Sequence, residues 1–267
     1  MRVNIMPCRF PLSDHEWPKQ LAAGVAVHGD ESHISQKPDG SDVHAFWGMH
    51  RRWGKTALAK GGPCLIVERA YLGDRFRWRA MGWNGLNGRA DFLNDDVPDD
   101  RWRKYWADSV KPWRDGGDYA LVIGQVQGDA SLEGANAYQW AVDACAKAKR
   151  KHGRVVYRPH PLARHKRPIR GAEYQDGDIA EAFAGASVVI TYCSNTAVEA
   201  VMAGIPAVAI TPMSMAWDVT SHDIDAPLVR PDRGEWGRRL AYCQWLPEEI
   251  ESGEAWAHLR KGALNGR

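Results

Sequence analysis

The segment 188–210, VVITYCSNTAVEAVMAGIPAVAI, constrains the fold more than any other part of the chain. Its first residues are apolar and mostly β-branched, which is typical of a strand buried on both faces. The polar triplet at 194–196 supplies helix-capping side chains, and Gly204 ends the helix before Pro206 opens the next strand. We therefore expect strand, turn, helix and strand in close succession.

A helix that begins at the carboxyl end of a parallel strand presents free N–H groups and the positive end of its dipole. Such a helix start is suited to an anion. The same residues also fit a purely structural capping box, Thr196-x-x-Glu199, which needs no ligand. Both interpretations stay open for this turn.

A second strand, predicted at 155–157, ends in Arg158-Pro159-His160-Pro161. The two prolines stiffen this loop and prevent it from continuing as helix or strand. Arginine offers a planar fork of donors, and histidine offers a donor that is neutral or charged near neutral pH. The pair at the end of a strand predicts a phosphate site.

The net charge is only +2, but the segment 147–170 holds ten Lys or Arg residues and no acidic residue. Part of this run ends a predicted helix, where cations suit the dipole, and the rest brackets His160. This placement favours a polyanionic ligand, either a nucleotide sugar or a nucleic acid. The 13 tryptophans, several of them among arginines at 75–113, suit core packing, sugars or unstacked bases.

The order of predicted elements indicates an α/β protein of two Rossmann-like domains facing a cleft. We expect an acceptor-side domain at 1–115 and a nucleotide-sugar-binding domain with closing C-terminal helices at 116–267, joined near Gly116-Gly117. In the first half we predict strands at 3–6, 24–27, 43–47 and 64–68, helices at 52–60 and 100–110, and a long functional loop at 73–100. In the second half three strands, at 120–123, 155–157 and 188–191, alternate with helices at 135–151, 179–184 and 196–203.

The five cysteines are scattered and include no C-x-x-C, so we expect reduced thiols and neither a disulfide framework nor a zinc site. His152, His160 and His165 are close in sequence, but no cysteine or acidic residue lies among them, and we expect no metal site there. The chain has no apolar run of membrane-spanning length and no signal-peptide core near its start. We expect a cytoplasmic protein without membrane insertion.

The RPHP loop at 158–161, followed by Ser194-Asn195-Thr196 and Glu199-Ala200, resembles the bacterial capsule-polysaccharide glycosyltransferases. This group includes the Kdo transferases and, more distantly, bacterial sialyltransferases of GT-B fold. The segments LVIGQVQGDAS at 121–131 and CQWLPEEIESGEAW at 243–256 are similar to the opening and closing parts of that family's second domain. The resemblance runs from about residue 119 to the end and is weaker before.

The resemblance implies a nucleotide-sugar-dependent glycosyltransferase that is metal-independent and inverting, with the nucleotide sugar as co-substrate and no other cofactor. It places the donor phosphate and ribose on the His-Pro loop and the Ser/Thr turn. The donor-binding residues implied in this sequence are Gln125, Arg158, His160, Ser194, Asn195, Thr196 and Glu199.

An inverting transferase needs a base that removes the proton of the acceptor hydroxyl. Glu68 follows the apolar strand at 64–67, and Glu68-Arg69-Ala70-Tyr71 resembles the family's acidic-acidic-Gly-aromatic motif, although Arg69 and Ala70 depart from it. Asp74, Asp91 and Asp30 are the alternative bases, and an ion pair with Arg69 or Arg75 is the structural alternative for Glu68. The residues expected to bind the acceptor lie in the loop that follows: Arg75, Arg77, Trp83, Asn84, Asn87 and Arg89.

The basic and aromatic residues favour, as acceptor, a hydroxymethylated pyrimidine in DNA, modified by a phage-type enzyme in the bacterial host cytoplasm. The alternative acceptor is a capsule or surface polysaccharide. Two other functions fit parts of the sequence: a nucleotide-sugar epimerase or hydrolase on the same scaffold, and a non-catalytic nucleic-acid-binding protein. The expected partners are thus a nucleotide sugar and either a glycan or DNA.

Overall fold

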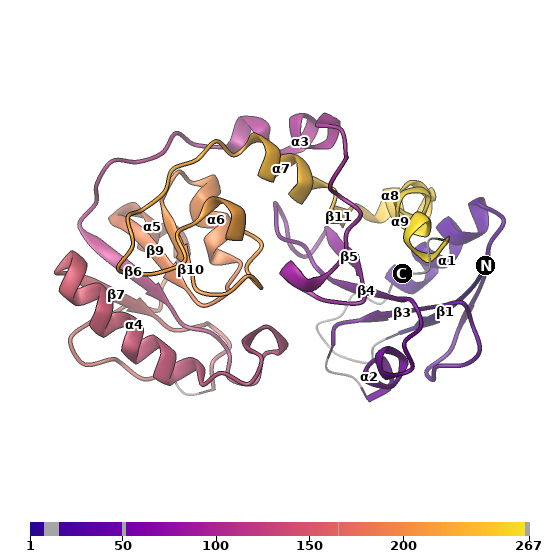
Figure 1. Ribbon diagram of the computed structural model, residues 1–267, viewed down its shortest axis with the longest axis horizontal. Helices are drawn as coiled ribbons and strands as arrows, with labels where there is room; N and C mark the ends of the chain where they lie inside the picture. The colour runs from indigo at the N-terminus through magenta and orange to yellow at the C-terminus, as the bar shows by residue number, and fades with distance from the viewer. Residues whose placement is uncertain (8–15, 50–51, 165, 265–267) are drawn as a thin grey trace. The chain divides into compact units, whose positions relative to one another are not determined.

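The computed structural model describes residues 1–7, 16–49, 52–164 and 166–264 (Figure 1). The chain forms two compact units, one made of residues 1–102 with 238–267 and the other of residues 103–237. Each unit has its own sheet flanked by helices. The prediction of two α/β units is therefore confirmed.

The sheet of the first unit has the strand order β11-β5-β4-β3-β1-β2. Its parallel part consists of β1 (Arg2–Met6), β2 (Glu31–Ile34), β3 (Val43–Trp47) and β4 (Cys64–Arg69). The strands β5 (Arg79–Trp83) and β11 (Gln244–Trp245) extend it in antiparallel fashion. Because β5 occupies the middle of 73–100, the long loop predicted there is wrong in this part.

The helices of the first unit are α1 (Trp17–Val27), α2 (Arg52–Ala59), α8 (Pro247–Glu251) and α9 (Glu254–Leu264), with the short turn η1 (Asn87–Arg89). The helix α3 (Asp100–Tyr105) spans the change of unit, and the short turn η2 (Ala107–Ser109) belongs to the second unit. The strand predicted at 24–27 is wrong, since these residues end α1. Leu21, Gly24 and Val25 are buried at helical spacing. A Cβ atom on Gly24 would lie 2.0 Å from the carbonyl oxygen of Ile250, so this face of α1 packs directly on α8.

The C-terminal segment belongs to the first unit, which differs from the predicted boundaries of 1–115 and 116–267. Trp245 and Trp256 are fully buried in one core with Trp17 and Trp83. Apolar side chains of α8 and α9 thus complete the core of the first sheet. The division predicted at Gly116-Gly117 falls inside the second unit.

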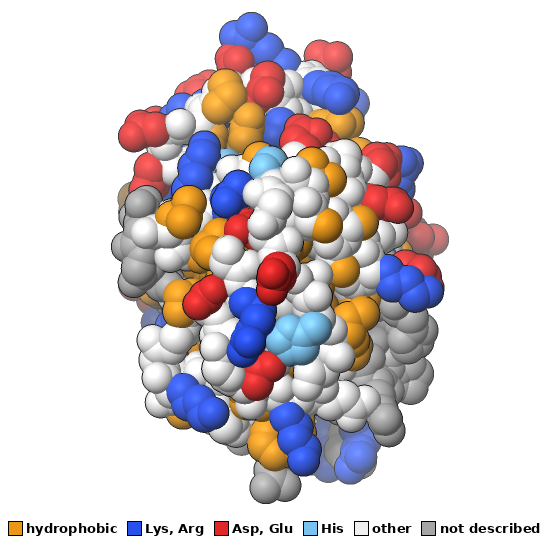
Figure 2. All heavy atoms as spheres, turned by 90° about the vertical axis from the view of Figure 1, so that its right-hand side faces the viewer, with side chains coloured by type: hydrophobic (Ala, Val, Ile, Leu, Met, Phe, Trp, Pro, Cys, Tyr) orange, Lys and Arg blue, Asp and Glu red, His pale blue; other side chains and the backbone are white. Residues whose placement is uncertain are grey.

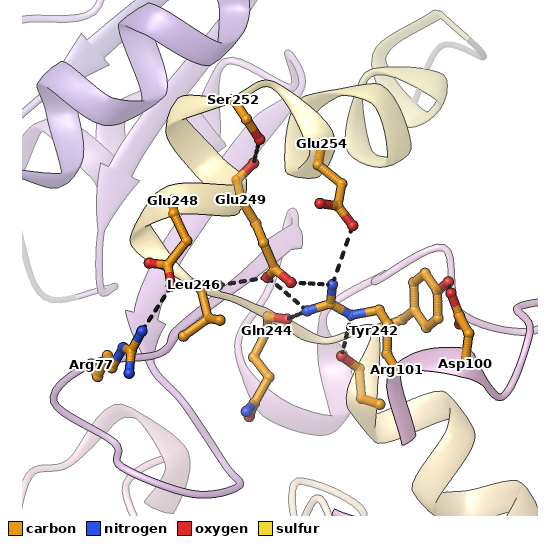
Figure 3. Close-up of polar contacts among 11 residues, drawn as sticks. Arg77, Asp100, Arg101, Tyr242, Gln244, Leu246, Glu248, Glu249, Ser252 and Glu254 are labelled. Atoms are coloured by element: carbon orange, nitrogen blue, oxygen red, sulfur yellow. Dashed lines mark hydrogen bonds and ion pairs between the residues drawn. The ribbon is translucent and has the colours of Figure 1, made fainter. Parts of the chain in front are cut away.

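Polar contacts fix the same C-terminal segment to the first unit (Figure 3). The buried guanidinium of Arg101 donates to both carboxylate oxygens of Glu249, at 2.8 and 2.9 Å, and to the carbonyl oxygen of Gln244 at 2.9 Å. The side chain of Gln244 accepts from the backbone N–H groups of Tyr71 and Leu72, each at 2.9 Å. A chain segment some 140 residues downstream is therefore part of the first fold.

The second unit has an all-parallel sheet with the order β10-β9-β6-β7-β8. Its strands are β6 (Tyr119–Ile123), β7 (Val155–Arg158), β8 (Glu173–Tyr174), β9 (Ala186–Thr191) and β10 (Ala207–Ala209). Its helices are α4 (Ala137–His152), α5 (Ile179–Ala184), α6 (Thr196–Met202) and the short turns η3 (Ala130–Leu132) and η4 (Trp217–Val219), while α7 (Gly234–Ala241) spans the change of unit. The three strand–helix pairs predicted for this half are confirmed.

The cysteines and the lengths of the helices also relate to the predictions made from the sequence. Cys64, Cys145, Cys193 and Cys243 are buried free thiols. Across the described ranges, no helix combines the length and the apolar character that crossing a bilayer requires.

Candidate functional site

The carboxyl ends of the parallel strands in the second unit bring the sequence-predicted donor residues to one edge of the sheet. Ile123 of β6 lies opposite Arg158 of β7, and Val122 lies opposite Ile190 of β9. The residues that follow these strands, Gln125, His160 and the triplet 194–196, therefore leave the sheet side by side. In parallel α/β sheets this edge is where ligands bind.

Gly124 allows the His-Pro loop to approach β6 closely. Its N–H donates to the carbonyl oxygen of Arg158 at 2.8 Å. A Cβ atom at this position would lie 2.8 Å from the hydroxyl of Tyr157, 3.1 Å from Cα of Pro159 and 3.3 Å from the backbone nitrogen of His160. Only glycine fits here without displacing the loop.

The ring of His160 is partly exposed and is oriented by its own loop. Its Nδ1 accepts a hydrogen bond from the backbone N–H of Leu162 at 3.1 Å. In the neutral ring the proton is then on Nε2, which makes Nε2 a donor. His160 thus has the tautomer needed to donate to an anionic oxygen.

Arg158 is half-buried at the end of β7. One terminal nitrogen donates to the carbonyl oxygen of Gly177 at 2.8 Å, and the buried Nε has no hydrogen-bond partner among the described residues. A buried guanidinium N–H without a partner is costly. The Nε–H group of Arg158 is therefore a hydrogen-bond donor available to a ligand close to His160.

Gln125 connects the loops after β6 and β9. Its Oε1 accepts from the backbone N–H of Cys193 at 2.9 Å, and its Nε2 donates to the sulfur of Cys193 at 3.2 Å. Burial raises the pKa of the Cys193 thiol, so this group is a neutral packing partner and no nucleophile. Sequence reasoning missed Cys193, although it stands directly between a buried strand and the polar triplet.

The triplet 194–196 forms a tight polar turn ahead of α6. Ser194 Oγ donates to Thr196 Oγ1 at 3.0 Å and accepts from the Thr196 N–H at 3.2 Å. Asn195 is the N-cap residue without a side-chain capping bond, and its amide donates to Glu199 at 3.3 Å. The Thr196–Glu199 capping box is therefore not the arrangement found, and three polar side chains line the end of β9.

In the first unit Glu68 lies at the carboxyl end of β4, half-exposed. Its Oε1 accepts from the N–H of Arg69 at 2.9 Å, and its Oε2 faces the backbone of Gly48 at the end of β3. Arg69 turns its guanidinium over the ring of Phe76, and Arg75 Nε donates to the carbonyl oxygen of Ala70 at 2.7 Å. The carboxylate therefore lies near the carboxyl end of a parallel strand, where α/β sheets commonly bind ligands.

The alternative carboxylates have structural roles. Asp74 and Asp91 each accept a backbone N–H two residues ahead, from Phe76 and Leu93, both at 2.9 Å. Asp30 is buried and binds the N-terminal amino group at 2.8 Å and the indole N–H of Trp256 at 2.8 Å. Asp74 is exposed and Asp91 half-exposed, whereas Asp30 is fixed within the fold.

Three of the residues predicted to bind an acceptor, Trp83, Asn84 and Asn87, are not basic. Trp83 is fully buried and donates to the carbonyl oxygen of Leu259 at 3.1 Å, so the prediction that it contacts an acceptor is wrong. Its side chain lies in the core because it points inward from β5, a strand within the segment predicted as a loop. Asn84 and Asn87 adopt left-handed backbone conformations, with φ of 57° and 51°, and Asn84 also accepts from the Cys64 N–H.

The three predicted acceptor arginines lie at or near the surface. Arg77 pairs with Glu248 at 2.7 Å, with both side chains exposed, while Arg75 is half-exposed and Arg89 is exposed. The tryptophans around them, Trp78, Trp102 and Trp106, are buried. Core packing therefore accounts for these three members of the tryptophan-rich segment.

Much of the basic run at 147–170 is used within the second unit. Lys149 and Lys151 donate to the carbonyl oxygens of Gly171 and Ile224, at 2.9 and 2.7 Å, and Arg154 pairs with Glu173 at 2.7 Å. The remaining cations at 164, 166, 167 and 170 are exposed beyond the His-Pro loop. On the face of the first unit seen in Figure 2, basic and acidic side chains are interspersed.

Metal chemistry has no evident ligand set in the part of the chain described here: no group of three or more His, Cys, Asp or Glu side chains converges there. His165, one of the three histidines considered for such a site, lies outside the described residues.

No protein-family model matches the chain, and no curated protein matches it. Two solved structures of Thermosulfurimonas dismutans KpsC share its fold. The β-Kdo 2,4-transferase is 17% identical, with 90% of this chain and 89% of that chain covered and a TM-score of 0.61. The β-Kdo 2,7-transferase is 13% identical, with 97% and 99% covered and a TM-score of 0.60. At these identities the likeness shows the fold.

Proposed function

We propose that the chain is a glycosyltransferase that moves a sugar from a nucleotide-sugar donor to an acceptor hydroxyl. The observation that carries this proposal is the convergence of His160, Arg158 and the triplet 194–196 at one edge of the second sheet. The fold shared with two Kdo transferases over most of both chains supports it.

The donor diphosphate or monophosphate binds at this edge. His160 donates through Nε2, the Arg158 guanidinium adds positive charge, and the Thr196 hydroxyl, which Ser194 Oγ holds by donating to it, completes the set of donors. Glu199 and Asn195 hold the turn, and Gln125 holds the turn to the neighbouring loop through Cys193. As the bond to the sugar breaks, these donors stabilise the charge that develops on the departing phosphate. The chemistry needs no metal and inverts the sugar carbon.

The donor site is tested by thermal shift with CMP-, UDP-, GDP- and dTDP-sugars. We expect His160→Ala and Ser194→Ala each to raise the dissociation constant of the stabilising sugar nucleotide about tenfold or more. A charge-assisted hydrogen bond contributes about 1.5–3 kcal/mol, which sets this scale. Ser252→Ala, on an exposed turn of the other unit, is the control. Unchanged affinity in both variants contradicts the assignment.

Glu68 acts as the general base that accepts the proton of the acceptor hydroxyl. Glu68→Gln keeps the shape and the acceptor for the Arg69 N–H but removes the basic oxygen. We expect turnover to fall by about two to four orders of magnitude with donor affinity unchanged, because the donor residues belong to the other unit. Steady-state kinetics and donor titration of the same variant check this. Full turnover in the Gln variant would show that Glu68 is not the base.

The acceptor has two candidates. The exposed cations beyond the His-Pro loop favour DNA carrying a hydroxymethylated pyrimidine, as in phage-type modification. The half-exposed carboxylate of Glu68 and the exposed residues of the loop that follows it favour a capsule-type glycan. Mass spectrometry of both acceptors after incubation with the stabilising donor distinguishes them.

Two competing functions give different results in the same assays. An epimerase or hydrolase converts the sugar nucleotide without any acceptor. A non-catalytic nucleic-acid-binding protein binds DNA in a strongly salt-dependent manner that no sugar nucleotide alters.

A further inference from the structure

The loop between β4 and β5 holds the aromatic ring of Phe76 in solvent. Phe76 is 69% exposed, more than any other large apolar side chain in the described ranges, where the other exposed ones are aliphatic residues and two tyrosines. Single exposed apolar residues are common on protein surfaces. The loop around Phe76, however, also has a fixed backbone and a cation stacked on the aromatic ring.

The backbone of this loop is fixed by a buried arginine. Arg79 is 5% exposed, and one terminal nitrogen donates to three consecutive carbonyl oxygens, those of Phe76 at 2.5 Å, Arg77 at 2.8 Å and Trp78 at 3.0 Å. Asp74 accepts the N–H of Phe76 from the other side. Because leaving a buried guanidinium without these acceptors is costly, the backbone of residues 76–78 is held in this conformation.

A cation also lies against the face of the Phe76 ring. The guanidinium carbon of Arg69 lies 4.4 Å from the centroid of the Phe76 ring, within the range of a cation–π interaction. Arg69 is the last residue of β4 and follows Glu68 directly. The aromatic ring is therefore held, through Arg69, at the end of the same strand that carries Glu68.

Charged side chains of both signs lie in and beside this loop. Its exposed arginine Arg77 pairs with Glu248 at 2.7 Å, Asp74 is a further carboxylate of the loop, and Arg79 is buried. A surface for a polyanion presents mainly unpaired positive charge. A mixture of donors and acceptors suits hydroxyl groups, which both donate and accept.

We propose that Phe76 is a stacking platform for a sugar ring of the acceptor. The C–H face of a pyranose is weakly positive and packs on the negative face of an aromatic ring, while its hydroxyls meet the surrounding arginines and carboxylates. This inference rests on the proposed function and deepens it, since it assigns the acceptor to the glycans and the platform to the neighbourhood of Glu68.

The test is ligand-observed saturation-transfer NMR with maltose, lactose, cellobiose and diacetylchitobiose, alongside an oligothymidylate. We expect at least one disaccharide to bind the unmodified protein and Phe76→Ala to weaken it about tenfold, because an aromatic contact beyond area burial is of this size. Phe76→Trp keeps binding, since the platform remains. Leu264→Ala, a similarly exposed apolar residue at the end of α9, changes nothing.

Absence of disaccharide binding, or equal binding by Phe76→Ala, overturns the inference. Binding of the oligothymidylate that depends on Phe76 overturns it in favour of a nucleic acid. Thermal shift with sugar nucleotides on the same variants separates this result from the proposed function. If no sugar nucleotide binds while disaccharide binding depends on Phe76, transferase activity fails and the platform stands.

Discussion

Arg101 illustrates how one buried side chain can connect distant parts of a chain. Its side chain is 4% exposed, donates to both oxygens of Glu249 and stacks on Trp245 with its guanidinium carbon 4.2 Å from the ring centroid. Such a pair is stable only when nearly every donor has a partner, because two charges have been removed from water. Arg101 meets this condition through additional carbonyl oxygens of Ala241 and Gln244.

We expect Glu249→Ala to destabilise the first unit by about 3–5 kcal/mol, because the buried Arg101 then loses its bidentate partner and keeps the more distant, exposed Glu254 at 3.6 Å. Glu248→Ala is the matched control, since the neighbouring Arg77–Glu248 pair is exposed and contributes less than about 1 kcal/mol. Urea unfolding followed by tryptophan fluorescence measures both. The double variant Arg101→Met, Glu249→Leu should recover part of the loss. A Glu249→Ala effect as small as that of the control would argue against an essential pair.

At the scale of elements, the edge of the second sheet that is proposed to bind the sugar nucleotide depends on how closely three loops pack. β6, β7 and β9 end together, and their loops are joined by the Gly124 N–H bond to Arg158 and by the Gln125–Cys193 contact. In the proposed site, each of these contacts sets the position of a residue that binds the donor.

Gly124→Ala tests this dependence. The added methyl group would meet the backbone of Pro159 and His160, so we expect a loss of about 1–3 kcal/mol in stability and a displaced His-Pro loop. A displacement of this kind weakens donor binding even though no donor contact is removed. Gly62→Ala is the control, because a Cβ atom there meets nothing within 4 Å. Donor titration and chemical unfolding of both variants give the answer, and equal behaviour of the two would contradict the packing argument.

At the scale of the whole molecule, the chain leaves its first unit near residue 102 and returns to it near residue 238. The second unit is continuous and has its own core of apolar side chains from β6, β7, β9 and α4. The first unit needs residues from both ends of the sequence, including the fully buried Trp256 and Leu259 of α9.

We therefore expect residues 103–237 to fold alone and to keep affinity for the stabilising sugar nucleotide. A chain that stops at residue 237 should retain this unit but lose cooperative folding of the first one. Removing β11, α8 and α9 exposes the core face that they cover. Circular dichroism and amide NMR spectra of the two fragments report the outcome. A folded first unit in the shortened chain would show that this unit does not need the C-terminal segment to fold.

The sequence by itself determined the parts whose pattern is local. The central strands of the second unit, β6, β7 and β9, are largely apolar runs, and α4 and α6 begin near polar capping residues and are followed by glycine, so periodicity and capping were enough for them. The positions of Gln125, His160 and the 194–196 triplet at strand ends followed from the same pattern. The prediction of two α/β units rests on this alternation.

Only the tertiary structure decided what depends on partners far along the chain. The residues at 24–27 are helical because they pack on α8, and β5 is a strand because it pairs with β4 and β11. Trp83 is a core residue for the same reason, and the C-terminal helices join the first unit because its core is open without them. Burial and strand pairing between residues more than a hundred positions apart leave no local period in the sequence, which is why these features required the fold itself.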